Sequence, residues 1–91
     1  MSTVIFLGQT LDTKDVLDEL RSFDRQFPKT NDYENWMRKK SYRYAIDYSG
    51  NLYPPKLILS WASGNETDEF SGGKQTNTVL EQLGLKVIKK P

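Results

Sequence analysis

The sequence contains no cysteine and no histidine among its 91 residues. Their absence excludes disulfide bonds, thiolate or imidazole metal ligands, Cys or His nucleophiles, and a histidine general base. No apolar run approaches the roughly 20 residues of a membrane-spanning helix, and the apolar stretch VIFL near the start is too short for a signal-peptide core. These absences favour a soluble, cytoplasmic protein and predict no metal or other cofactor.

The chain is also short, so we expect a single domain over residues 1–91. A domain of this size buries only about 60–65% of the surface that its unfolded chain exposes, which leaves a modest core. A deep, closed enzyme pocket is therefore not expected. Asp47 has no second carboxylate placed near it by the pattern, and no nucleophile–base pair is evident. The sequence predicts a protein that is not an enzyme.

The charge is unevenly distributed, although its sum is only +1. Residues 1–37 contain seven acids and four bases, whereas residues 38–64 contain one acid and five bases. Two interpretations remain open: a solvated basic face, or a surface that binds a polyanion. The bases of this middle segment are Arg38, Lys39, Lys40, Arg43 and Lys56.

Apolar periodicity predicts a small α+β domain. The predicted domain has about four helices and a short, mostly antiparallel sheet that includes one hairpin. The first and last strands could pair with each other or flank the hairpin, and the pattern does not choose between these arrangements. The expected elements are a strand at 3–8, helices at 13–27 and 31–40, a hairpin at 41–53, helices at 54–63 and 74–83, and a strand at 85–90.

The segment SGGK, residues 71–74, precedes the last helix and has two interpretations. Backbone N–H groups at a helix start form an anion site, and Gly72 and Gly73 would let a phosphate approach closely, with Lys74 adding charge. The spacing of a Walker loop is missing. Alternatively, the glycines only permit a tight turn, with Ser71 as the helix cap.

Other basic and aromatic residues also have two interpretations. Lys56 lies in the first turn of a helix, where the dipole disfavours a cation, so it either meets an anionic ligand or extends into solvent. The bases at 38–40 suit the last turn of a helix, which is a structural reason for their presence. Tyr42 and Arg43 are candidates for contact with bases or phosphates.

The second half of the chain resembles a known domain. The segments YRYAIDYSGNLYPPKLILSWASG and FSGGKQTNTVLEQLGLKV are similar to the head domain near the N-terminus of McrA-type, modification-dependent HNH restriction endonucleases. That family shows G-x-x-YPPK, an apolar helix, F-x-GG, a threonine-bearing helix and LG-[FL]-x-V, and the resemblance covers roughly residues 12–88. Leu85 stands where phenylalanine is common in the family. The matching residues are Gly50, Tyr53, Pro54, Pro55, Lys56, Phe70, Gly72, Gly73, Thr76, Leu80, Leu83, Gly84 and Val87.

The resemblance implies a non-catalytic DNA-binding module of a restriction or defence system. It does not carry over the nuclease, because an HNH site needs histidines. The expected partners are duplex DNA and other domains or subunits of a restriction complex. The alternative is a protein-interaction domain, such as a phage-type inhibitor of a defence complex, which would use the acidic helix at 13–27. The predicted DNA contacts are Arg38, Lys39, Lys40, Tyr42, Arg43, Lys56, Ser71, Gly72, Gly73 and Lys74.

Overall fold

The computed structural model describes residues 2–28, 36, 38–39 and 42–90. Within these residues the chain forms three α-helices, one short 3₁₀ helix and two antiparallel sheets, which confirms the predicted α+β class. The elements are β1 (Thr3–Phe6), β2 (Gln9–Asp12), α1 (Thr13–Gln26), β3 (Tyr44–Tyr48), β4 (Asn51–Tyr53), α2 (Pro55–Ser63), the 3₁₀ helix (Thr67–Glu69), α3 (Lys74–Gln82) and β5 (Lys86–Lys89).

The helix count differs from the prediction, because the described residues contain three α-helices and not four. The helix predicted at 31–40 falls almost wholly outside the described residues. The described positions within it are not helical, since Trp36 and Arg38 lie in turns. The helix predicted at 13–27 is confirmed as α1, which ends at Gln26 with Phe27 as its C-cap.

The strand predicted at 3–8 is confirmed only for its first four residues, because the chain reverses at Leu7 and Gly8. Both residues have positive φ, 49° and 80°, and they connect the paired residues Phe6 and Gln9. Positive φ at both central residues is the geometry of the two-residue turns that suit the twist of a hairpin. Residues 9–12 therefore form a second strand, β2, ahead of the first helix.

The predicted hairpin is confirmed as β3 and β4, joined by a two-residue turn at Ser49 and Gly50. The last strand, β5, pairs antiparallel with the other edge of β3, so the sheet has the order β4-β3-β5. This arrangement decides the question that the sequence left open. The last strand flanks the hairpin, and the first strand belongs to a separate two-stranded sheet.

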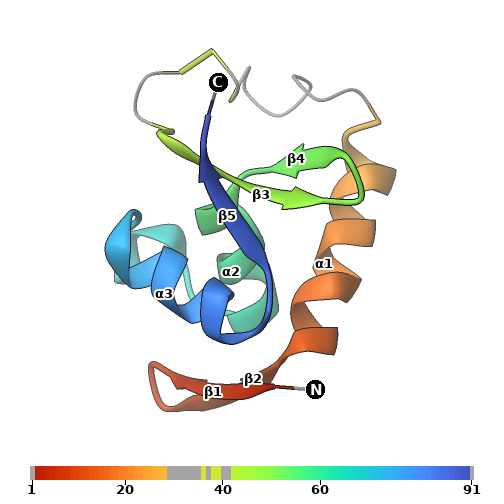
Figure 1. The fold of residues 1–91 in the computed structure, drawn as a ribbon. Helices are drawn as coiled ribbons and strands as arrows, with labels where there is room; N and C mark the ends of the chain where they lie inside the picture. Colours follow the sequence, from red (N-terminus) through yellow and green to blue (C-terminus); the bar gives the residue numbers. More distant parts are fainter. Residues whose placement is uncertain (1, 29–35, 37, 40–41, 91) are drawn as a thin grey trace.

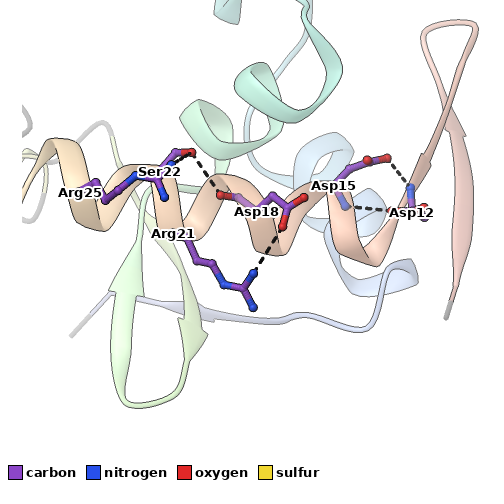
Figure 2. Close-up of polar contacts among 6 residues, drawn as sticks. All are labelled: Asp12, Asp15, Asp18, Arg21, Ser22 and Arg25. Carbon is purple, nitrogen blue, oxygen red and sulfur yellow. Dashed lines mark hydrogen bonds and ion pairs between the residues drawn. The ribbon is translucent and has the colours of Figure 1, made fainter.

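The helix α1 begins with a reciprocal cap that its sequence encodes. The Asp15 N–H donates to the Asp12 carboxylate at 2.9 Å, and the Asp12 N–H donates to the Asp15 carboxylate at 3.0 Å (Figure 2). Two N–H groups that lack partners within the helix are thereby satisfied. Beyond the cap, Val16, Leu20 and Phe23 form the buried stripe of the helix.

The helices lie between the two sheets, with the β1–β2 hairpin at one end and the β3–β5 sheet at the other (Figure 1). Phe6 on the hairpin meets Phe70 edge-to-face, with ring centroids 5.2 Å apart. Apolar side chains from every layer therefore share one core. Its fully buried members include Val16, Leu20, Trp36, Ile46, Ile58, Leu59, Leu80 and Leu83.

Tyr53 connects β4 to α1 immediately ahead of the PPK segment. It is 3% exposed, and its hydroxyl donates to the Asp24 carboxylate at 2.9 Å. Burial first, and then the hydrogen bond and charge of Asp24, raise the pKa of Tyr53 to about 12. The neutral phenol is thus favoured in the folded protein.

This raised pKa predicts a loss of stability in alkali. The contribution of Tyr53 is complete below about pH 10, the usual tyrosine pKa, and is lost as the pH rises through about 12. Urea unfolding across that range should show the native protein losing on the order of 2 kcal/mol more than Tyr53→Phe. Asp24→Asn, which removes the charge but keeps an acceptor, should fall between them. Identical pH profiles for the native protein and Tyr53→Phe would contradict this account.

Candidate functional site

A groove of about 690 Å³ opens where three separate parts of the chain meet. The first wall is the segment that leads into β3, and the second is the first turn of α2. The third is the turn at residues 71–73, called the glycine turn, together with the first turn of α3. The 3₁₀ helix contributes Thr67. The lining residues are Tyr42, Arg43, Tyr44, Pro55, Lys56, Leu57, Thr67, Gly72, Gly73, Thr76 and Asn77.

Lys56 is half-buried and packs against the glycine turn. A Cβ placed on Gly72 would lie 3.7 Å from the Lys56 Cδ, and the Lys56 Nζ lies 5.7 Å from the centre of the Phe70 ring. The aliphatic stem thus lies beside a residue without a side chain, while the ammonium group is near an aromatic face. The YPPK and FSGG segments, remote in sequence, are therefore in contact.

Of the two glycines in the turn, only Gly73 adopts a backbone conformation that requires glycine. Gly73 has φ 64° and ψ −127°, a region open almost only to glycine, and it is the N-cap of α3. The suggested role of Ser71 as the cap is therefore wrong. Gly72 has no positive φ, so its conformation is open to other residues.

Ser71 is held by hydrogen bonds within the turn. Its N–H donates to the Gln75 side-chain oxygen at 2.8 Å, and its carbonyl accepts from the Thr76 hydroxyl at 2.7 Å. The Ser71 amide is therefore engaged and is not a free donor for an anion. No side chain caps the start of α3, so its first N–H groups rely on solvent or a ligand.

Five of the ten predicted contact residues line the groove: Tyr42, Arg43, Lys56, Gly72 and Gly73. Tyr42 and Arg43, at the end of the basic segment 38–43, thus line the same groove as the glycine turn. Four others lie outside the lining, and Lys40 lies outside the described residues. The four are Arg38, Lys39, Ser71 and Lys74; Lys74 begins α3 next to the groove and is exposed.

Sequence reasoning missed several groove residues, above all Tyr44 and Asn77. Tyr44 follows Tyr42 at the two-residue period that places side chains on the same face of a strand, and that spacing could have identified it. Thr76 and Asn77 lie in the first turn of α3, next to the predicted glycine turn. Their proximity in sequence was the available signal, but helix periodicity assigned Thr76 to the core only.

Lys90 holds the first wall of the groove in place from the far end of the chain. Its Nζ donates to the carbonyls of Trp36 at 2.6 Å and Lys39 at 2.9 Å, and lies 5.8 Å from the centre of the Tyr42 ring. Its backbone N–H donates to the Arg43 carbonyl at 2.9 Å. Burial lowers the pKa of Lys90, and the two carbonyls compensate the ammonium group for lost water.

The charged residues that line the groove, Arg43 and Lys56, are both positive. The described lining residues include no Asp or Glu, and Asp47 on β3 lies 3.8 Å from Lys86 in an ion pair. The groove therefore favours an anion.

Among the described residues no group of His, Cys, Asp and Glu could hold a metal ion, and no helix in that part of the chain is long and apolar enough to cross a membrane.

No protein-family model matches the chain, and no curated protein or solved structure matches it either. The relation to the restriction-endonuclease head domain therefore stays a prediction from motifs. The functional argument rests on the geometry of the groove.

We expect alanine substitution to cost much more stability at Gly73 than at Gly72. Gly73→Ala should lower the free energy of unfolding by about 1–3 kcal/mol, because alanine is strained at this φ and ψ. Gly72→Ala is the matched control and should cost less than about 1 kcal/mol, because its Cβ would make an ordinary contact with Lys56. Chemical denaturation measures both values, and equal losses would contradict the assigned turn geometry.

The two adjacent lysines near the C-terminus provide a second matched pair. Lys90→Met should lower the free energy of unfolding by roughly 1–2 kcal/mol, because it removes a cation bonded to two carbonyls. Lys89→Met removes an exposed lysine and should leave stability almost unchanged. Thermal or urea unfolding of the two variants tests this, and similar losses would show that Lys90 does not hold the segment.

Proposed function

We propose that this domain is a non-catalytic DNA-binding module that holds backbone phosphate in the groove. The observation that carries the proposal is the contact between Lys56 and Gly72, with Arg43 lining the same groove. Two cations and a turn without side chains thus face one open space. Phosphate oxygens accept strong, charge-assisted hydrogen bonds from lysine and arginine, and glycine lets the backbone approach them.

Such contacts would position DNA without identifying its sequence. Each neutralised phosphate releases counterions, so affinity should fall steeply as salt increases. The first N–H groups of α3 have no side-chain cap and add a favourable dipole for an anion beside the groove. Arg38 and Lys39, which lie outside the described lining, then have no necessary part in the groove itself.

We also propose that the module belongs to a modification-dependent restriction or DNA-defence system, with other domains or subunits of that system as partners. The support is the motif resemblance in the second half of the chain. The contact of Lys56 with Phe70 and Gly72 gives the joint occurrence of YPPK and F-x-GG a physical reason, because each segment completes the surroundings of the other.

The second candidate function is binding of a partner protein, and one observation favours it. Ile5 and Leu7 on the N-terminal hairpin are 75% and 47% exposed, which is unusual for large apolar side chains. The outer face of α1 gives less support than its acidity suggested. Asp18 pairs with Arg21 at 3.5 Å within a face of mixed charge (Figure 2).

Fluorescence anisotropy of labelled duplex DNA at about 50 mM and about 200 mM salt tests DNA binding. Lys56→Met should weaken binding and reduce the slope of log affinity against log salt by about one. Lys14→Met, which removes an exposed lysine from the first turn of α1, is the matched control and should bind like the native protein. Plain and cytosine-modified duplexes should be compared in parallel.

Failure to bind any DNA at low salt, duplex or single-stranded, would rule out the DNA-binding function for this domain. Equal losses in Lys56→Met and Lys14→Met would show binding by net charge and not by the groove. If no DNA binds, the exposed N-terminal hairpin would become the leading candidate for the functional surface, and protein partners should be sought.

A further inference from the structure

The groove is larger than contact with a phosphate requires. Its volume of about 690 Å³ lies within the range of pockets that enclose whole small molecules, about 300–1,000 Å³. Contacts to the backbone of an intact duplex need only an exposed basic surface. The space beyond Lys56 and the glycine turn therefore leaves room for another part of a ligand.

Two tyrosines form the wall at the start of β3. Tyr42 and Tyr44 are both half-buried and line the groove. The Tyr42 ring meets Trp36 edge-to-face, with centroids 6.5 Å apart, and Tyr44 lies on a strand paired with β5 at Lys89. The Tyr42 ring is thus held by contacts within the fold, and the backbone of Tyr44 is fixed by the sheet. Aromatic side chains of this kind stack with the exposed faces of unpaired bases.

Asn77 supplies an unsatisfied polar group in the third wall. Its side-chain oxygen is buried and accepts no hydrogen bond among the described residues, whereas the neighbouring Thr76 hydroxyl is bonded to Ser71. A buried acceptor without a partner is costly and normally finds a donor. Because this oxygen has almost no accessible surface, the Asn77 side chain would have to turn into the groove before the exocyclic amine of a base donates to it.

We infer that the groove accommodates one unpaired nucleotide of a DNA strand. This inference rests on the proposed DNA-binding function and specifies its ligand. The phosphate lies against Lys56 and the glycine turn, and the base lies against the wall of Tyr42 and Tyr44, towards Asn77. A base inside a duplex is stacked between its neighbours and cannot enter such a groove. Single strands and duplexes with an unpaired base should therefore bind better than intact duplexes.

The test is an anisotropy competition between a single strand, the intact duplex of the same sequence, and that duplex with one unpaired base. The single strand and the unpaired-base duplex should bind about five-fold to 150-fold more tightly than the intact duplex, the range expected for stacking of one base. Tyr44→Leu should abolish most of this preference, and Tyr44→Phe should retain it. Tyr48→Leu, on the same strand but outside the groove lining, is the matched control and should behave like the native protein.

The outcomes separate this inference from the function on which it rests. Equal affinity for all three DNAs, with normal salt dependence and a normal loss in Lys56→Met, would overturn the unpaired-nucleotide inference and leave phosphate binding intact. No binding to any of them would overturn both. Because Tyr44→Leu could also lower stability, thermal unfolding is measured alongside, and loss of the preference in a fully folded Tyr44→Phe variant would also overturn the role of the ring.

Discussion

The packing of Lys56 against the glycine turn is the contact on which the groove depends. The lysine stem lies beside Gly72, just ahead of α3, where even an added Cβ would be only 3.7 Å from the Lys56 Cδ. The ammonium group then lies near the ring of Phe70, which is itself fixed by Phe6 of the N-terminal hairpin. One cation is thereby positioned by contacts that extend from the groove through the core to the opposite sheet.

The wall that carries Tyr42 and Arg43 depends on contacts with residues far away in the sequence. Lys90 bonds to the carbonyls of Trp36 and Lys39, and the adjoining strand β5 pairs with β3. The segment that carries Tyr42 and Arg43 is thus held by the last residues of the chain. A partly buried ammonium group is destabilised when its carbonyl partners are lost, so Lys90 couples the order of the segment to the order of the C-terminus. The basic C-terminus consequently has a structural role that its composition alone did not indicate.

The parts of the fold that local sequence determines could be predicted. The hairpin β3–β4 follows from alternation around Ser49 and Gly50, and α2 follows from its prolines and apolar residues. The N-terminal turn was missed because Leu7 adopts positive φ, which a leucine gives no reason to expect. The partner of β5 and the contacts of Lys90 join residues that are 39 or more positions apart, and no local pattern encodes them. For the site, residue types identified Lys56 and the glycines, but only the fold showed that Tyr42 and Arg43 join them while Arg38 and Lys39 do not.

The central claim is that DNA occupies this groove, and amide chemical-shift mapping by NMR tests it most directly. Titration with DNA should shift the amides of Gly72, Gly73 and Lys74 together with those of residues 42–44 and Lys56. The hairpin around Ile5 and the outer face of α1 should remain unchanged. Shifts confined to the hairpin or to α1, or no shifts at low salt, would contradict the account and place the functional surface elsewhere.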